Sequence, residues 1–286
     1  MTRTPRLTAT ALRAGWTRGR VELIQSFTNG ADLLSHFLWP VLMLTVMYFM
    51  RDSSFGSEGL LLGTLALPSI LGMNAAMGML TMSQVLTAER EDGTLLRAKA
   101  TPHGMQGYFI GKIITVSCGL VADLAIFLVP ALFLVEGLSI TGAGSWLTLS
   151  WVLVLGMLAT LPFGAVLGSV FTSTRAQGII QLPVLGLIAI SGIFYPITTL
   201  PEWLQSVAQV FPVYWLGLGM RAALLPDSAV TIEIGESWRQ WETLGTLTTW
   251  AAIGFALAPL VLRRTARRES GSNVAARRER ALRRVG

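Results

Sequence analysis

Few side chains in this 286-residue sequence have the types and spacing that catalysis requires. The histidines His36 and His103 do not form the H-E-x-x-H motif of a zinc enzyme. Cys118, the only cysteine, lies in an apolar run and is predicted to be a small core residue. A serine protease within a membrane would need a histidine in a late apolar segment to activate Ser191, and those segments have none. The sequence therefore predicts neither a catalytic residue nor a metal site.

The sequence also lacks a loop that could bind the phosphates of ATP. The nearest match to G-x-x-x-x-G-K-[ST] starts at Gly107, is one residue short and has no hydroxyl after Lys112. A nucleotide-binding domain needs about a hundred residues or more, and the hydrophilic connections are far shorter. Gly107 and Gly111 are better explained as small residues at a helix–helix contact, as are Gly164 and Gly168.

Asp123 is a single carboxylate in the middle of an apolar segment, where it costs roughly 2.5 to 3.5 kcal/mol on insertion scales. No second carboxylate accompanies it, so an aspartyl protease pair is not predicted. Two interpretations are open: a cation or proton contact in a transport path, or a hydrogen-bonded carboxyl that fastens helices together. Asp32 and His36, one helical turn apart near the edge of another apolar segment, are predicted to form a local pair.

The elements that hold these residues are predicted to lie in a lipid bilayer. Hydrophobic residues make up 52% of the chain and charged residues 13%, and the mean hydropathy is +0.58. A soluble domain has about a quarter of its residues charged. Neither a disordered chain nor a disulfide-rich secreted protein has this apolar excess with a single cysteine. The composition therefore excludes these classes and favours a membrane protein.

Six segments have roughly the 20 mostly apolar residues that a membrane-spanning helix needs. Each contains a proline, which neighbouring spans can accommodate within a bundle. The predicted spans are Ala31–Met50, Leu60–Leu86, Ile113–Val135, Trp146–Phe171, Gly178–Thr199 and Thr243–Leu262. We therefore predict an all-α polytopic membrane protein with six transmembrane helices.

The basic residues set the predicted orientation. With both termini in the cytoplasm, 19 of the 22 lysines and arginines fall in cytoplasmic segments. The basic surplus is expected to contact lipid headgroups, and no nucleic acid is expected because no recognition helix or zinc spacing accompanies it. The predicted division is a cytoplasmic segment at residues 1–30, a transmembrane domain at residues 31–262 and a basic cytoplasmic tail at residues 263–286.

The first 30 residues predict a helix in the membrane interface rather than a cleavable signal peptide, because they lack a continuous apolar core. Apolar side chains recur on one side of this helix, at Leu12, Trp16, Leu23 and Phe27. Charged side chains fall largely on the other side, at Arg13, Arg18, Arg20 and Glu22.

The connection at residues 87–112 is dense in charge. Its first part is predicted to form a short helix across the cytoplasmic membrane surface, with Leu95 and Leu96 beneath it. Its acidic residues are expected to face water; they are Glu89, Glu91 and Asp92. An ordinary charged loop fits the composition equally well.

The outer connection at residues 191–242 combines prolines with apolar and aromatic residues. Pro196, Pro201 and Pro212 exclude a single straight span. The segment is therefore predicted to enter the membrane and return. Non-helical backbone at that depth must be shielded, so we expect the segment to cap the outer end of a pathway or a dimer interface.

Two groups of motifs, in this order, resemble the permeases of type-2 ATP-binding-cassette (ABC) exporters, most of all the daunorubicin-resistance type. The first group is Glu89-Arg90-Glu91, Gly93-Thr94-Leu95, Thr101-Pro102 and Lys112. The second group is Ser191-Gly192, Tyr195-Pro196, Leu200-Pro201-x-Trp203-Leu204 and the run from Pro212 to Arg221. The resemblance covers essentially the whole chain. It implies six spans, an interfacial N-terminal helix, a coupling helix after span two and a re-entrant outer hairpin between spans five and six.

The resemblance implies that ATP is hydrolysed by other subunits. Two cytoplasmic ABC ATPase subunits would hold ATP and Mg²⁺, and a second permease copy or a paralogue would complete the pathway. The coupling helix would dock on an ATPase subunit and transmit its closure to the spans. The implied contacts are Glu89, Arg90, Glu91, Asp92, Gly93 and Thr94.

The resemblance also implies export of hydrophobic or amphipathic drugs or lipids, here across a bacterial cytoplasmic (inner) membrane. The predicted pathway lining is Met73, Asn74, Met77, Asp123, Gln181 and Phe194, although these residue types also occur as ordinary packing. The predicted outer cap is Tyr195, Pro196, Pro201, Trp203 and Pro212. The alternative function is a secondary transporter powered by an ion gradient, with Asp123 as its proton site.

Overall fold

The structure is a computed structural model that describes residues 6–50, 54–55, 60–100, 104–135, 138, 140, 142–171 and 174–268. Its α-helices are α1 (Arg6–Thr28), α2 (Gly30–Met50), α3 (Leu62–Glu91), α4 (Thr94–Lys99), α5 (Gly104–Leu134), α6 (Ala143–Val170), α7 (Thr174–Ile190), α8 (Glu202–Val210), α9 (Pro212–Leu224) and α10 (Gln240–Arg268). Shorter 3₁₀ turns are η1 (Ile197–Thr199), η2 (Asp227–Ile232) and η3 (Ile234–Glu236). Strands β1 (Ser54–Phe55) and β2 (Leu60–Leu61) pair antiparallel, with Ser54 opposite Leu61.

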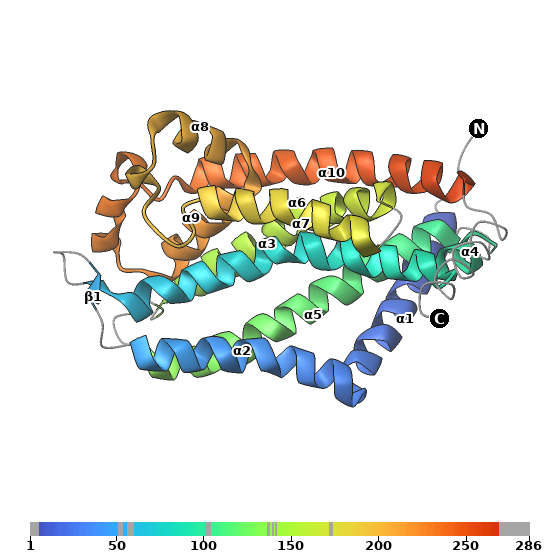
Figure 1. Cartoon of the computed structure of the whole chain (residues 1–286), viewed down its shortest axis with the longest axis horizontal. Helices are drawn as coiled ribbons and strands as arrows, with labels where there is room; N and C mark the ends of the chain where they lie inside the picture. The colour runs from blue at the N-terminus through green and yellow to red at the C-terminus, as the bar shows by residue number, and fades with distance from the viewer. Residues whose placement is uncertain are drawn as a thin grey trace.

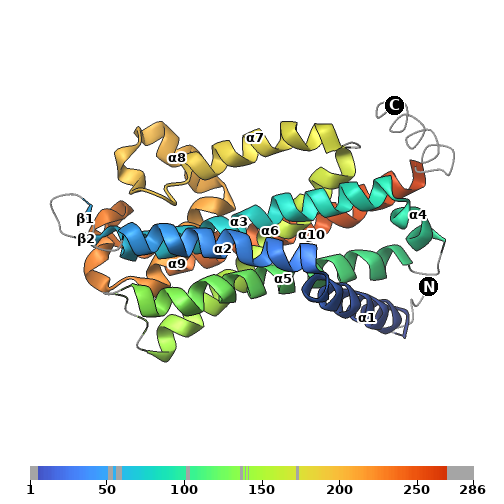
Figure 2. The same ribbon diagram turned by 60° about the horizontal axis from the view of Figure 1, so that its bottom comes forward.

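The long helices run along the long axis of the molecule (Figure 1). They extend between an end that holds α4 and an end that holds α8, α9 and the strand pair. In both views α1 and the C-terminal end of α10 lie at the α4 end (Figures 1 and 2). The first and last described helices therefore approach the same side of the molecule, in keeping with the prediction that both termini share a side. That this side is cytoplasmic stays a prediction.

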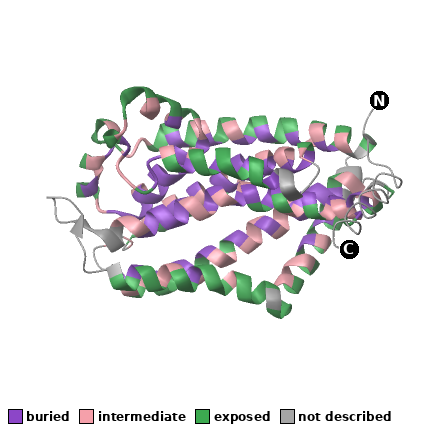
Figure 3. Ribbon diagram, in the orientation of Figure 1, coloured by how far each residue is buried: buried purple, intermediate pink, exposed green. Residues whose placement is uncertain are grey.

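The core is centred on α3, α6 and α9. α9 is buried along nearly its whole length and packs against both α3 and α6. Figure 3 colours most residues of α2 and many residues of α10 as exposed. Several of these are apolar, such as Phe49 on α2 and Trp241 on α10, and Phe133 on α5 is exposed as well. Because lipid tails are as apolar as a protein core, such residues suit a lipid-facing surface.

Two helix pairs approach closely through glycine. A Cβ atom at Gly164 would lie 2.2 Å from the carbonyl oxygen of Met79, so α6 packs directly on the backbone of α3. Gly168 lies in a similar contact one turn further along α6. On α5, a Cβ atom at Gly111 would lie 3.1 Å from the carbonyl oxygen of Gly15 on α1. The predicted packing role of Gly111, Gly164 and Gly168 is confirmed.

Among the described residues, helix length and composition support five of the six predicted spans: α2, α3, α5, α6 and α10 are long and apolar enough to cross a membrane. The fifth predicted span, Gly178–Thr199, corresponds to α7, which has 17 residues and ends at Ile190. Gly192 then adopts a left-handed conformation with φ 66°, which turns the chain out of the helix. α7 is thus a shorter apolar helix, and the count of six spans stays a prediction.

α3 and α5 extend beyond their predicted ends. α3 continues past Leu86 to Glu91, and α5 begins at Gly104, well before Ile113. A helix does not stop where its apolar run stops, because Glu, Arg and Gln are good helix formers. Between α3 and α5 the structure describes only the turn at Asp92 and Gly93, helix α4 and Ala100, so the predicted connection at residues 87–112 is shorter than expected. Thr101, Pro102 and His103 lie outside the described residues.

α1 packs along α5 through the side that carries Arg18 and Glu22. Both side chains form ion pairs within the bundle, whereas Leu12 and Trp16 are 57% and 61% exposed. The predicted helix forms, but this part of its charged side faces protein rather than water. In a membrane interface the apolar side can turn to lipid, which leaves polar groups to pair inward.

Candidate coupling site and transport pathway

The turn between α3 and α4 lies at one end of the bundle. Gly93 has a φ of 76°, a left-handed conformation that a residue with a Cβ atom rarely adopts. The amides of Leu96 and Arg97 donate to the Gly93 carbonyl oxygen at 3.1 and 3.2 Å, which starts α4. Glycine at this position therefore sets the direction in which α4 leaves α3.

α4 is anchored by its apolar side. Leu95 and Ala98 are buried in a cluster with residues of α3, α5, α6 and α10, whereas Leu96, predicted to lie beneath the helix with Leu95, is half-buried. Asp92 is exposed, and Glu91 and Thr94 are half-buried. The turn can therefore offer carboxylate and hydroxyl groups to a partner while its other side stays fixed to the bundle.

Glu89 and Arg90 are held inside the protein. The Glu89 carboxylate forms an ion pair with Lys112 and a second, at 3.6 Å, with Arg18. Arg90 is buried, and its Nη1 donates to the Ser169 carbonyl oxygen on α6 at 3.0 Å. The prediction that Glu89 faces water is wrong, because cations of α5 and α1 lie beside it.

Four charged side chains join α1, α3 and α5 next to this turn: Arg18, Glu22, Glu89 and Lys112, called here the inner charge cluster. Lys112 Nζ lies 2.6 Å from Glu22 Oε2, and Arg18 Nε lies 2.8 Å from Glu22 Oε1. The Lys112 side chain is only 5% exposed. Burial by itself would raise the pKa of Glu22, but the hydrogen bonds and charges of Lys112 and Arg18 hold that pKa below its usual value.

Sequence reasoning found neither the inner charge cluster nor a second polar contact, between α3 and α7. Ser83 Oγ donates to Gln177 Oε1 at 3.1 Å, and the Gln177 amide donates to Thr87 Oγ1. All three side chains are buried. A sequence signal did exist, because Ser83 and Thr87 recur four residues apart at the end of a predicted span. Hydrogen bonds between membrane helices contribute about 0.6 kcal/mol each on average.

Asp123 on α5 pairs with His36 on α2. His36 Nδ1 lies 2.5 Å from Asp123 Oδ1, and Phe27 stacks on the imidazole with 4.5 Å between ring centroids. The predicted local pair of Asp32 and His36 is wrong, because Asp32 accepts a hydrogen bond from Asn29 at 3.1 Å instead. The pair with His36 offsets part of the cost of a carboxylate within a span.

Asn74 lines a cavity of about 40 Å³ with His36 and Asp123, among α2, α3 and α5. Its side-chain amide donates to the carbonyl oxygen of Ile70 at 2.9 Å. A cavity of this size has room for ordered water but not for a bulky molecule. Of the predicted pathway residues the structure brings Asn74 and Asp123 together here. The lining of this cavity does not include Met73, Met77, Gln181 or Phe194.

We expect Asp123→Asn to change stability by less than about 1 kcal/mol, because an amide oxygen can still accept a hydrogen bond from neutral His36. Asp123→Leu is expected to cost about 1–3 kcal/mol, because it leaves the imidazole without its partner. Thermal unfolding of the purified protein checks both values, with Asp32→Asn as an exposed control. Loss of transport in a stably folded Asp123→Asn protein would instead favour a cation or proton contact.

The predicted cap residues surround η1, α8 and α9. The Tyr195 hydroxyl donates to the carbonyl oxygen of Ala189 and so ties the turn back to α7. Pro201 precedes α8 and Pro212 is the first residue of α9, where a missing backbone N–H leaves no helical hydrogen bond unmade. Trp203 is 68% exposed on α8. These short helices agree with a segment that enters and returns, while its depth in the membrane stays a prediction.

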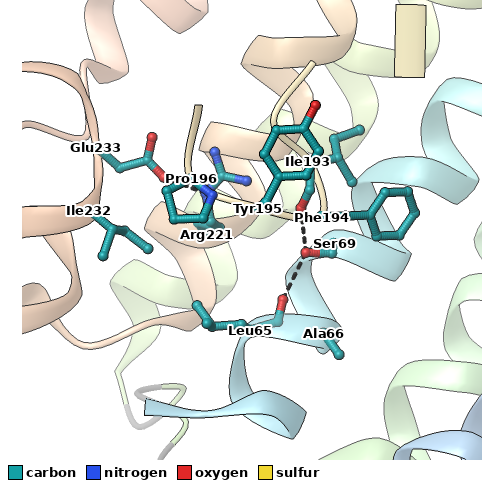
Figure 4. Close-up of a pocket in the computed structure, with 10 residues that line it drawn as sticks. All are labelled: Leu65, Ala66, Ser69, Ile193, Phe194, Tyr195, Pro196, Arg221, Ile232 and Glu233. Atoms are coloured by element: carbon teal, nitrogen blue, oxygen red, sulfur yellow. Dashed lines mark hydrogen bonds and ion pairs between the residues drawn. The ribbon is translucent and has the colours of Figure 1, made fainter. Parts of the chain in front are cut away.

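A pocket of about 130 Å³ lies beside this turn, with Pro196 in its lining (Figure 4). Arg221 on α9 and Glu233 after η2 form a buried ion pair there, with 2.5 Å between Nε and Oε1. Arg221 Nη1 also donates to the Gly192 carbonyl oxygen at 3.1 Å. Ser69 on α3 donates to the carbonyl oxygen of Ile193. The pair therefore holds the turn after α7 in place. Arg221 is the last residue of the second group of sequence motifs, and these motifs do not predict its partner.

Comparison with known proteins gives a family match. Residues 23–225 match the family model described as ABC-2 type transporter. Two relatives, from Escherichia coli K12 and O157:H7, are both named "Probable multidrug ABC transporter permease YbhR". Each is 28% identical over 174 residues, which cover 60% of this chain and 46% of the relative. The chain thus spans less than half the length of these relatives. The residues matched by the family model include the α3–α4 turn and Arg221.

Proposed function

Because this chain belongs to the ABC-2 type transporter family, we propose that it is the permease subunit of an ATP-driven exporter. It is a multi-pass membrane protein with several helices long and apolar enough to cross a bilayer. In this proposal two separate ABC ATPase subunits bind ATP and Mg²⁺, and a second permease copy or a paralogue completes the pathway. The complex lies in a bacterial inner membrane and exports hydrophobic or amphipathic drugs or lipids.

The observation that carries this proposal is that α4 directly follows the end of α3 that holds Glu89, a member of the inner charge cluster. The turn before α4 exposes Asp92, while Glu89, one turn earlier on α3, binds Lys112 on α5 and Arg18 on α1. A force applied to α4 by a docked ATPase would therefore reach three long helices through short ionic contacts. In this mechanism Glu91, Asp92 and Thr94 form the docking surface, and Glu89 and Arg90 transmit its movement.

The cargo is proposed from the apolar character of the chain. No sharply polar binding motif accompanies the predicted pathway, which suits selection by shape and apolar burial. The E. coli relatives are named as probable multidrug permeases, which supports a cargo of this kind. A transporter powered by an ion gradient has less support, because the proposed proton site Asp123 already pairs with His36. Gradient-driven flux from the chain alone, without an ATPase, would favour that alternative.

We expect Glu91→Lys to weaken binding of the ATPase at least about tenfold, because a cation would replace a carboxylate at the docking surface. Co-purification of the ATPase with the tagged permease, together with ATP-dependent export, measures this effect. Glu202→Lys is the matched control, because it makes the same charge change on exposed α8 at the opposite end of the molecule. Equal co-purification and export by the two variants would refute the assigned docking surface.

A further inference from the structure

A groove lies near the α4 end of the molecule, bounded by α1, α5 and α10. Its apolar walls include Leu12 on α1, Phe109 on α5 and Leu262 on α10. Its polar lining, among the described residues, is Gln106 and Arg263. The volume is about 360 Å³, which lies in the range of about 300–1,000 Å³ that ligand pockets occupy. The groove is therefore large enough for a ligand that has both an apolar and a polar part.

We propose that this groove binds an anionic phospholipid, with an acyl chain against its walls and the phosphate at Arg263. The walls require an apolar occupant, since Leu12 is 57% exposed in the protein alone. The polar end suits an anionic one, because Gln106 is neutral and none of the described lining residues carries a carboxylate that could pair with the Arg263 guanidinium. An anionic lipid satisfies both conditions in one molecule.

The surroundings of the groove add to this charge complementarity. Arg264 and Arg267 are exposed on the same last turns of α10, next to Arg263. Juxtamembrane arginines attract the anionic headgroups of the cytoplasmic leaflet. The α4 end, where these arginines lie, is also the end that the charge pattern of the sequence places in the cytoplasm.

Other occupants match the groove less well. A zwitterionic phospholipid has the same acyl chains, but its headgroup has no net charge with which to attract Arg263. Free phosphate would leave the apolar walls uncovered. A second copy of this chain, related by a two-fold axis, would bring a surface of the same positive charge toward the first.

Native mass spectrometry of the purified full-length chain tests the proposal without an ATPase or a cargo. Phosphatidylglycerol and phosphatidylcholine with identical acyl chains are the two probes. We expect about fivefold tighter binding of phosphatidylglycerol, the factor that corresponds to about 1 kcal/mol for one arginine near an anionic headgroup. Arg263→Gln should remove most of this preference, and Leu12→Gln should weaken the binding of both lipids.

Arg264→Gln is the matched control. It removes the same charge at the next position along the chain, and the Arg264 side chain does not line the groove. We expect this variant to keep most of the preference for phosphatidylglycerol. Equal binding of both lipids to the unaltered chain, or equal effects of the two arginine variants, would overturn the proposal in favour of non-specific boundary lipid. If glycerol 3-phosphate stabilised the chain as much as phosphatidylglycerol does, the site would recognise only the phosphate group. A change of oligomeric mass in Arg263→Gln would instead assign the groove to a second copy.

Discussion

Lys112→Met is expected to lower the free energy of unfolding by about 3 kcal/mol, the lower end of the cost of breaking a buried ion pair. Lys112 contacts both Glu22 and Glu89, and its own side chain is 5% exposed. Methionine keeps the apolar length of the side chain, so the loss reports the charge rather than a cavity. Arg18 still reaches both carboxylates, which is why we expect the lower end of the range. Equilibrium unfolding of the purified protein in detergent measures the effect.

Two further variants separate charge from a general effect of substitution. Arg20→Met removes an exposed cation from α1 and is expected to change stability by less than about 1 kcal/mol. Combining Lys112→Met with Glu22→Gln and Glu89→Gln removes the carboxylates that lose their partner, and should recover part of the loss. If Lys112→Met were as stable as Arg20→Met, the inner charge cluster would not hold the three helices together.

Lys112→Met is also expected to make the protein less stable in acid. The pKa of Glu22 in the folded protein lies below its usual value, so this carboxylate stabilises the fold above the unfolded pKa of about 4.3. That contribution is lost as the pH falls through the lowered folded pKa. Without Lys112 the pKa of Glu22 rises, and acid unfolding of Lys112→Met should begin at a higher pH than in the unaltered protein. An unchanged acid midpoint would contradict the assigned role of Lys112.

The sequence predicted the helical membrane architecture because long apolar runs have few alternatives in a bilayer. It predicted the ends of the helices less well. Apolar composition defines what lies in lipid, whereas the helix of α3 continues through charged residues to Glu91. The end of α7 at Ile190 depends on the left-handed Gly192, a backbone feature that an apolar run does not reveal.

The polar contacts were the least predictable part of the site. His36 and Asp32 are neighbours on one helix, yet the partner of His36 is Asp123 on another helix. The spacing in α1 separates an apolar side from a charged side, but it does not show that Glu22 binds Lys112 on α5. Both cases have the same cause: local spacing says which residues share a face, but not which helix packs against that face.

Glu233→Leu is expected to lower the free energy of unfolding by about 3–5 kcal/mol, because it leaves a buried guanidinium without its carboxylate. Arg221 and Glu233 are 4% and 1% exposed, so water cannot replace the missing partner without a rearrangement of the turn. The nearby pair of Arg239 and Glu242 is a control, because Glu242 is 53% exposed and 3.6 Å from its partner. Glu242→Leu should therefore cost less than about 1 kcal/mol.

The double variant Arg221→Met/Glu233→Leu separates the ion pair from the contact with the turn. Replacing both charges with apolar side chains removes the unpaired guanidinium, so stability should recover by several kcal/mol relative to Glu233→Leu. Recovery should stop about 1–3 kcal/mol short, because the Gly192 carbonyl oxygen loses the hydrogen bond from Arg221. A double-mutant cycle of equilibrium unfolding measures both quantities. Full recovery would mean that Arg221 does not hold the turn, and no recovery would mean that the loss in Glu233→Leu comes from packing rather than from charge.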